Sequence, residues 1–338
     1  MGIVVNLESG KNQSPSLDLM VNITNKDLLK VNELIVRCMD SPVNLIPQIA
    51  GHIVAAGGKR IRPMITLTAA QLCGYRGKRH IALAACVEFI HTATLLHDDV
   101  IDESALRRGI KTTNSIWGNQ SSILVGDYLL SRCFEIMVDD GDLEILKLLS
   151  STSSKIAQGE VLQLQHKGEA DLLEETYIKI INLKTAALFS AATRTGACLA
   201  GSSEKEKEAL ESYGKNIGIA FQIADDALDY YSKETIFGKK IGKDFYEGKT
   251  TLPLIIIFQR ANNEERSFLL EILKKEKRNE DDFSETLALI NKYKAVQESL
   301  KRAEYFVNVS RDALGIFDDN QDKIVLQNLT GFSLNRSF

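Results

Sequence analysis

The sequence predicts an all-α protein made of long, stacked helices, and three observations carry this prediction. No proline occurs between Met64 and Leu252, although the chain has five prolines in total. This tract is rich in Ala, Leu, Ile, Glu and Lys, and its apolar residues recur at spacings of three and four, as in helices that bury one face. Alternating apolar and polar residues, which would indicate strands, are scarce.

The individual helices follow from this spacing and from its interruptions. Gly57-Gly58 separates two apolar stretches, Arg107-Arg108-Gly109 follows a long one, and Gly238, Gly242 and Gly248 interrupt a lysine-rich segment. Several more helices are expected in the tail. The expected helices before it cover residues 27–40, 43–56, 60–74, 78–103, 119–138, 142–167, 171–200, 203–234 and 250–262.

The chain is long enough for a substantial core. Of its 338 residues, 44% are hydrophobic and 25% are charged. Residues 1–25 are polar and rich in Ser and Asn, and we expect them to form a flexible N-terminal arm. Residues 26–338 are expected to form a single all-helical domain.

Charge and cysteine usage restrict the partners and the location. The formal net charge of -4 argues against nucleic-acid binding, which needs a basic footprint. The five cysteines are scattered without CxxC spacing, as in reduced core residues. No signal peptide is evident, and no apolar run approaches the ~20 residues that span a bilayer. We therefore expect a soluble, cytoplasmic protein without a transmembrane segment.

Two aspartate clusters share one spacing, DDxxD. On a helix, positions i, i+1 and i+4 project to one side, so each cluster presents carboxylates on one face. Oxygen ligands without cysteine or several histidines suggest Mg²⁺, which completes its octahedron with water and substrate phosphates. Two such patches suggest a shared polyphosphate. The clusters are Asp98-Asp99-Val100-Ile101-Asp102 and Asp225-Asp226-Ala227-Leu228-Asp229.

Either cluster alone could be an ordinary solvated helix face, because acidic pairs four residues apart are tolerated at modest cost. The flanking residues favour a functional interpretation. Each cluster interrupts a stretch that is otherwise apolar or small, AACVEFIHTATLLHDD in one case and NIGIAFQIADDALDYY in the other. We therefore expect both clusters to face a cavity rather than bulk water.

A series of segments resembles the motifs of the trans-prenyltransferases, the polyprenyl diphosphate synthases, and most resembles the long-chain octaprenyl and decaprenyl enzymes. The segments occur in the family's order from the end of the predicted arm onwards. They are GGKRIRP (57–63), HTATLLHDDVIDES (91–104), RRG (107–109), GEVLQL (159–164), KTAALF (184–189), FQIADDALDY (221–230), and GKKIGKD with GKTTLP (238–253).

The resemblance implies a fold and a reaction. The fold is isoprenoid synthase-like, a single bundle of long helices around a deep central cavity with both aspartate motifs near its mouth. The family joins isopentenyl diphosphate to an allylic diphosphate, releases diphosphate and uses two or three Mg²⁺ ions. Carboxylates that hold Mg²⁺ against phosphate oxygens suit this chemistry, because the leaving group needs its developing charge neutralised.

The resemblance also implies roles for single residues. Asp98, Asp102 and Asp225 are expected to bind the metal. The catalytic set combines both aspartate motifs with three further residues that contact the allylic diphosphate or position the reacting allyl group. This set is Asp98, Asp99, Asp102, Lys184, Thr185, Gln222, Asp225, Asp226 and Asp229.

Basic residues complete the expected substrate sites. Arg107 and Lys240 would contact the allylic diphosphate together with Lys184, and Lys249 would help to close the site. His91 lies seven residues before Asp98, about two helical turns, and so on the same face. The residues expected to bind isopentenyl diphosphate are Lys59, Arg62, His91 and Arg108.

Product length should depend on the apolar space below the first motif. Ala93 and Thr94 lie about one turn before Asp98 and are small, so growth to an octaprenyl to decaprenyl chain should be unobstructed. Such a product would serve as the side chain of a respiratory quinone. Phe134 and Met137 are candidate floor residues, and ordinary core packing is the alternative for both.

Other functions remain open at this stage. A shorter-chain farnesyl or geranylgeranyl synthase shares the motifs. A non-catalytic partner subunit of a heteromeric synthase is a further alternative, which the two intact aspartate motifs disfavour. A terpene cyclase would not need GGKRIRP or a complete second motif. By resemblance we expect a homodimer with an interface on residues 119–138 and 142–167, and peripheral membrane contact for product release.

Overall fold

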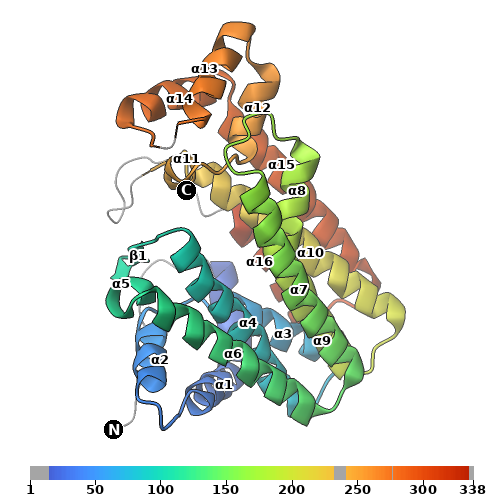
Figure 1. Ribbon diagram of the computed structural model, residues 1–338. Coiled ribbons are helices and arrows are strands. Elements are labelled where there is room, and N and C mark those ends of the chain that lie inside the picture. Colours follow the sequence, from blue (N-terminus) through green and yellow to red (C-terminus); the bar gives the residue numbers. More distant parts are fainter. Residues whose placement is uncertain (1–14, 232–240, 276, 335–338) are drawn as a thin grey trace. The chain divides into compact units, whose positions relative to one another are not determined.

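The computed structural model describes residues 15–231, 241–275 and 277–334 (Figure 1). Most of these residues are helical, so the predicted all-α class is confirmed. Within the described ranges, the sole β-structure is an antiparallel hairpin of two short strands, in which Leu106 pairs with Lys111 and Arg107 with Ile110. The strands are β1 (Leu106–Arg107) and β2 (Ile110–Lys111).

The helices follow one another through short loops. A π-helical turn, η1, joins α8 to α9, and a 3-10 turn, η3, follows α15. The helices are α1 (Pro15–Cys38), α2 (Leu45–Ala55), α3 (Ile61–Leu72), α4 (Arg79–Ile101), α5 (Thr113–Trp117), α6 (Asn119–Asp140), α7 (Leu143–Gln165), α8 (Glu174–Ile181), η1 (Asn182–Ala186), α9 (Ala187–Leu199), α10 (Glu204–Leu228), α11 (Lys243–Glu247), α12 (Leu252–Arg260), α13 (Asn263–Leu273), α14 (Glu280–Lys292), α15 (Ala295–Ala313), η3 (Leu314–Ile316) and α16 (Gln321–Leu334).

The first helix differs from the prediction. Helix α1 begins at Pro15, so the second half of the predicted arm is helical rather than flexible. Its apolar residues Leu17, Met20 and Leu28 are buried, at spacings of three and eight, which place them on one face. The residues between them are a mixture of apolar and polar side chains. Proline is well tolerated in the first turn, because its missing N–H has no partner there.

The chain forms two compact units. Among the described residues, unit 1 comprises those within 1–153, 188–211 and 314–332, and unit 2 comprises those within 154–187, 212–313 and 333–338. Within unit 1, α4 packs against α1, α3, α5 and α6. Helices α3 and α9 approach closely, since a Cβ at Gly196 would lie 2.6 Å from the backbone nitrogen of Ala70.

Helix α4 is long and apolar enough to cross a membrane by length and composition alone, contrary to our expectation that no segment would be. However, 61% of its most apolar 18-residue window is buried inside the protein, as in the core helix of a folded domain.

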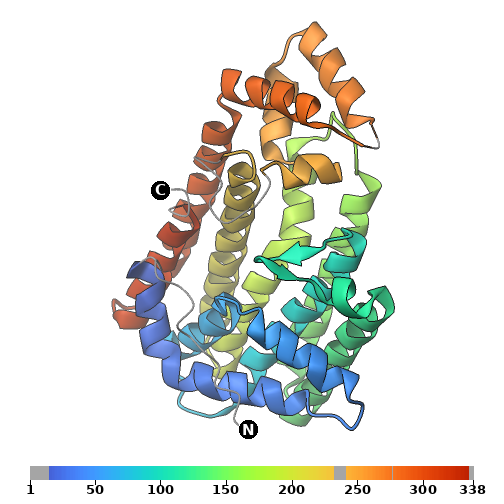
Figure 2. The same cartoon turned by 90° about the vertical axis from the view of Figure 1, so that its left-hand side faces the viewer.

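Within unit 2, α12 packs against α8, α14 and α15, and α12 and α14 are among the orange helices of Figure 2. Its three consecutive isoleucines, Ile255 to Ile257, are all buried, so α12 is covered on several sides. Tyr177 of α8 and Phe245 of α11 belong to the same core. This core supports the second aspartate motif at the end of α10.

Candidate functional site

The first aspartate motif lies where α4 ends. Asp98 and Asp99 occupy its last turn, and Asp102 is the residue that caps it. The backbone N–H of Asp102 donates to the carbonyl of Asp98 at 2.8 Å, and that of Ser104 donates to the carbonyl of Asp99 at 2.9 Å. Glu103 between them has a φ of 48°. The chain therefore turns sharply at the motif and leads into the β1–β2 hairpin.

The carboxylate of Asp99 is held by Arg107 of β1. The Nε of Arg107 lies 3.0 and 3.1 Å from the two carboxylate oxygens, and its Nη2 lies 2.8 Å from Oδ1. Asp99 is only 4% exposed. Bidentate arginine–carboxylate pairs fix geometry as well as charge. Asp99 is therefore anchored by the protein, and Arg107, which we expected on the allylic diphosphate, contacts this aspartate.

Asn114 of α5 is a second anchor, which the sequence did not indicate. Its Nδ2 donates to the backbone carbonyls of Asp99 and Ser104 at 3.0 and 3.3 Å. The hydroxyl of Thr112 also donates to the carbonyl of Ser104, at 2.6 Å. The bond to Asp99 satisfies a carbonyl of the last helical turn, which has no intrahelical partner, and the bonds to Ser104 hold the chain that follows. They fix the direction in which the motif leaves α4.

A cluster of basic residues lies nearby in the same unit, at the start of α3 and along α4. The Nη1 of Arg62 lies 3.1 Å from the Nε2 of His91. Burial lowers the pKa of Arg62 to about 10, and burial together with the charge of Arg62 and its neighbouring arginines lowers the pKa of His91 well below its usual value. Because a guanidinium can only donate, Nε2 of His91 accepts, which leaves the ring proton on Nδ1. Neutral His91 is thus a hydrogen-bond donor.

Further contacts orient this cluster. The guanidinium of Arg62 lies 4.4 Å from the ring centre of Phe189, a cation–π contact that fixes its plane. Arg108 has a φ of 54° and donates from Nη1 to the carbonyl of Gly57. Lys59 is exposed beside them. Four residues expected to bind isopentenyl diphosphate, Lys59, Arg62, His91 and Arg108, thus come from one unit.

The second aspartate motif lies at the end of α10 in unit 2. Asp225 is exposed, whereas Asp226 is 6% exposed and hydrogen-bonded at both carboxylate oxygens. The hydroxyl of Tyr177 donates to Oδ2 of Asp226 and Nε2 of Gln222 donates to Oδ1, both at 2.7 Å. Burial outweighs these bonds and raises the pKa of Asp226 to about 7, and the charge of Asp225 adds to the shift.

Asp229 holds the segment that follows. Its Oδ2 accepts from the backbone N–H of Asp244 at 2.8 Å, and its carbonyl accepts from the N–H of Gly242 at 2.9 Å. Burial raises the pKa of Asp229. Lys249, expected to help close the site, forms an ion pair with Glu247 at 2.7 Å. Lys240, expected on the allylic diphosphate, lies outside the described residues.

Lys184 and Thr185 lie in the π-helical turn η1, which the sequence did not predict. The Nζ of Lys184 donates to Glu160 at 2.7 Å and to Gln163 at 2.9 Å, both on α7. The hydroxyl of Thr185 donates to Oε1 of Gln222 at 2.9 Å. Single π turns inside α-helices occur frequently at functional sites. Here the turn directs two adjacent side chains to two different helices.

The two motifs therefore share one design. The second aspartate of each is buried and bound by protein donors, Arg107 in one case and Tyr177 with Gln222 in the other. The first aspartate of each is more accessible. No group of three or more His, Cys, Asp and Glu side chains is placed to hold a metal ion by itself among the described residues. Oxygen-only donors with partial coordination fit a hard divalent cation that binds together with phosphate oxygens.

The expected chain-length residues differ in burial. Ala93 and Met137 are buried in unit 1, and the hydroxyl of half-buried Thr94 donates to the carbonyl of His91 at 2.8 Å. Phe134 is 45% exposed on α6. Within this chain, Phe134 therefore lies at the surface of its unit, and its role as a floor residue stays a prediction.

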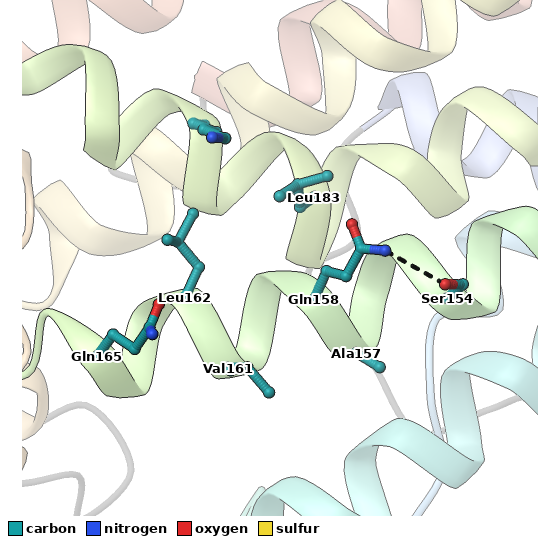
Figure 3. A pocket seen from close by; sticks show the side chains of 8 residues that line it. Ser154, Ala157, Gln158, Val161, Leu162, Gln165 and Leu183 are labelled. Atoms are coloured by element: carbon teal, nitrogen blue, oxygen red, sulfur yellow. Dashed lines mark hydrogen bonds between the residues drawn. The ribbon is translucent and has the colours of Figure 1, made fainter.

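A groove of about 430 Å³ in unit 2 contains none of the expected site residues (Figure 3). It lies between α7 and the α8–η1 segment and is lined by apolar side chains, such as Val161, Leu162 and Leu183, and by polar ones, among which Lys179 is charged. Gln158 donates to the hydroxyl of Ser154 at 3.4 Å along its wall. The groove offers no charged cluster suited to a diphosphate.

Comparison with known proteins places these features in a family. The sequence profile of the polyprenyl synthetase family matches residues 43–290. The octaprenyl diphosphate synthase of Haemophilus influenzae is 38% identical over 323 residues, which are 96% of this chain and 98% of that protein. The octaprenyl diphosphate synthase of Escherichia coli is 44% identical over 254 residues, 75% of this chain and 79% of that protein.

A solved structure of a protein in the same family also matches this chain. The crystal structure of a decaprenyl diphosphate synthase from Rhodobacter capsulatus has a TM-score of 0.91 and 42% identity, and the match covers 95% of this chain and 99% of that one. The predicted isoprenoid synthase-like fold is thereby confirmed. The chain belongs to the polyprenyl synthetase family.

Proposed function

We propose that the protein is a long-chain all-trans polyprenyl diphosphate synthase, which adds isopentenyl diphosphate repeatedly to an allylic diphosphate to give an octaprenyl to decaprenyl product. The observation that carries this proposal is the pair of DDxxD motifs, each with a buried, anchored second aspartate and a more accessible first one. The identity of 38% to an octaprenyl diphosphate synthase, over nearly the whole of both chains, supports the long product.

Asp98, Asp102 and Asp225 are the proposed Mg²⁺ ligands. Two or three Mg²⁺ ions would neutralise the charge that develops on the departing diphosphate. The anchored aspartates Asp99 and Asp226 keep the backbone of each motif in place, so the ligands do not have to be reorganised when substrate arrives. Lys184, Arg107, Lys240 and Lys249 add positive charge for the same diphosphate.

The basic cluster of unit 1 binds isopentenyl diphosphate in this proposal. Lys59, Arg62 and Arg108 supply charged donors, and neutral His91 supplies the Nδ1–H. The lowered pKa of Arg62 reports how far this guanidinium is removed from water, which strengthens its attraction to phosphate oxygens. No metal ligand is needed at this site.

The hydroxyl–amide pair of Thr185 and Gln222 positions the reacting allyl group. Oε1 of Gln222 accepts from Thr185 and its Nε2 donates to Asp226, so the amide is oriented at both ends. Its carbonyl dipole can stabilise a positive charge on the allyl carbons. The proton lost after the new C–C bond forms goes to the departing diphosphate, and no protein base is required.

Further proposals concern the assembly. Residues 26–338 act as one catalytic domain, and the protein works as a homodimer in the cytoplasm, with peripheral membrane contact for release of its product. Exposed apolar residues on α6 support the dimer, because several exposed apolar side chains on one helix favour association with another protein surface. They are Ile123, Leu124, Phe134 and Val138.

Turnover by the purified chain tests the proposed function. Diphosphate release should require an allylic diphosphate, isopentenyl diphosphate and Mg²⁺ together. Release with the allylic substrate alone would instead indicate a terpene cyclase. No turnover without a second polypeptide would indicate a non-catalytic partner subunit.

A further inference from the structure

Arg60 stands at a strained position between two expected substrate-binding residues, Lys59 and Arg62. Its φ of 49° lies in the left-handed region, which side chains other than glycine rarely adopt. It also precedes the first residue of α3, and the helix receives no side-chain cap there. A residue of this kind keeps its conformation only when its surroundings hold it. The contact that holds Arg60 comes from α4.

Glu88 of α4 holds the side chain of Arg60. The Nη1 of Arg60 donates to Oε1 of Glu88, and the two side chains are only 11% and 7% exposed. Glu88 lies three residues before His91, close to one helical turn, so it shares a face with that histidine. The ion pair therefore joins the start of α3 to the part of α4 that carries His91.

A contribution to folding stability does not by itself explain why the carboxylate of Glu88 is buried. Taking an ion pair out of water costs about as much as its attraction returns. In addition, Oε2 of Glu88 is buried and has no hydrogen-bond partner in the part of the chain that the structure describes. A buried acceptor left unpaired costs free energy. Buried groups of this kind call for an explanation beyond packing.

The surroundings of Glu88 suggest the explanation. It is a carboxylate that faces a group of arginines, Arg60, Arg62 and Arg108. Its negative charge opposes the lowering of the Arg62 and Arg108 pKa values that burial causes. Glu88 therefore lets several guanidinium groups lie close together in their charged form, although they repel one another.

We propose that Glu88 is a positioning residue for the isopentenyl diphosphate site, which acts through Arg60 to fix the first turn of α3 and, with it, Lys59 and Arg62. This inference rests on the proposed function. Glu88 does not touch the substrate in this scheme, because its charge would repel a diphosphate. Instead, Glu88 fixes the geometry of the residues that donate hydrogen bonds to the substrate.

A positioning role and a purely electrostatic role of Glu88 predict opposite changes in the affinity for isopentenyl diphosphate when the charge of Glu88 is removed. Glu88→Gln keeps the shape of the side chain and removes its charge. If charge alone mattered, loss of a carboxylate beside an anion site would tighten isopentenyl diphosphate binding. If Glu88 positions the donors, the Kd and KM for isopentenyl diphosphate should rise about tenfold, while KM for the allylic substrate changes much less.

Asp140→Asn is the matched control. Asp140 is likewise a carboxylate of unit 1 with a buried side chain, 4% exposed, and it accepts from Arg79 at 2.7 and 2.6 Å. Its loss should lower stability without changing the Kd for isopentenyl diphosphate. Arg60→Gln removes the same ion pair from the other side. Its effect on the Kd for isopentenyl diphosphate should therefore not add to that of Glu88→Gln.

Direct titration of each folded variant with isopentenyl diphosphate, without the allylic substrate, measures Kd when no turnover occurs. A Kd that is raised in Glu88→Gln and Arg60→Gln but not in Asp140→Asn supports the proposal. An unchanged or lower Kd in Glu88→Gln, or in Arg60→Gln if the first variant does not fold, overturns it. Failure of the unmodified chain to bind isopentenyl diphosphate would instead remove the proposed function.

Discussion

Arg107 donates to both carboxylate oxygens of Asp99, at 2.8 to 3.1 Å, and joins the first strand of the hairpin to the last turn of α4. The neighbouring Asp98 belongs to the same motif but is not among the buried residues of α4. Two adjacent aspartates thus have different environments. We expect their substitution to have different consequences.

Asp98→Ala should lower kcat by at least about 10³-fold, because removal of a metal ligand leaves developing charge on the leaving group uncompensated. The Mg²⁺ concentration that gives half-maximal rate should rise with it. Steady-state rates measured over a Mg²⁺ titration test this. Near-normal rates would remove Asp98 from the metal role.

Asp99→Asn should also lower kcat, since the amide cannot accept the full set of bonds from Arg107. In contrast to Asp98→Ala, it should leave the Mg²⁺ requirement nearly unchanged, because this carboxylate is already engaged by the protein. The same titration measures both variants. Equal shifts in Mg²⁺ requirement would show that both aspartates bind metal.

Gly159→Ala should damage the π-helical turn. A Cβ at Gly159 would lie 2.6 Å from the backbone nitrogen of Lys184 and 2.9 Å from Cβ of Leu183. Because backbone must then move, we expect a loss of about 1–3 kcal/mol in stability and a lower kcat. Gly51→Ala is the control, since a Cβ there meets nothing within 4 Å and alanine favours the interior of α2. Thermal unfolding and rates distinguish the two.

Ala93→Phe should shorten the product. Ala93 is fully buried one turn before the first motif, and a phenyl ring there would block the apolar space for the growing chain. Overpacking should cost about 1–3 kcal/mol as well. Ala303→Phe, at a fully buried alanine of unit 2, should show a similar cost with unchanged product. Product chain lengths of the two variants, resolved by chromatography, provide the measurement. Unchanged length in Ala93→Phe would refute the assignment.

Glu144 links the stability of unit 1 to pH. Its oxygens accept from Nζ of Lys207 at 2.9 and 2.8 Å, and this bond holds the pKa of Glu144 below its ordinary value of 4.5. A lowered pKa in the folded state gives stability that is present above pH 4.5 and is lost as the pH falls through the folded value. The side chain of Glu144 is 47% exposed, so solvent screens the pair and its contribution is small, about 1 kcal/mol or less.

Glu144→Gln should therefore have a slightly lower Tm than the unmodified chain at neutral pH. The difference should disappear in acid, where Glu144 is protonated in both states. Thermal unfolding of the two proteins at a series of pH values tests this. A constant difference down to roughly pH 3 would mean that packing, rather than charge, accounts for it.

Local sequence patterns were sufficient for the helical class and for the placement of both aspartate motifs on helices. They did not give the end of α10, which lies at Leu228 rather than at the expected residue 234. Apolar spacing and proline-free stretches depend on residues close in sequence, so they can be recognised directly. The start of α1 was misjudged, because residues 1–25 as a whole are rich in Ser and Asn, whereas Leu17 and Met20 within them are buried.

The partners of the buried carboxylates at the site were not predictable in the same way. Tyr177 reaches Asp226 from 49 residues away, and Arg60 reaches Glu88 across 28. Neither pair has a characteristic spacing, because each depends on how two separate helices pack. The π turn at Lys184 likewise has no local sequence signal. Tyr177, Asn114 and Glu88 are therefore the site residues that only the structure revealed.

The most direct test of the central claim is mass spectrometry of the prenyl diphosphates formed by the purified chain from farnesyl diphosphate, isopentenyl diphosphate and Mg²⁺. We predict octaprenyl to decaprenyl diphosphate as the main products, with none when Mg²⁺ is chelated. A product that stops at geranylgeranyl diphosphate, or the absence of any condensation, would contradict the assignment as a long-chain synthase.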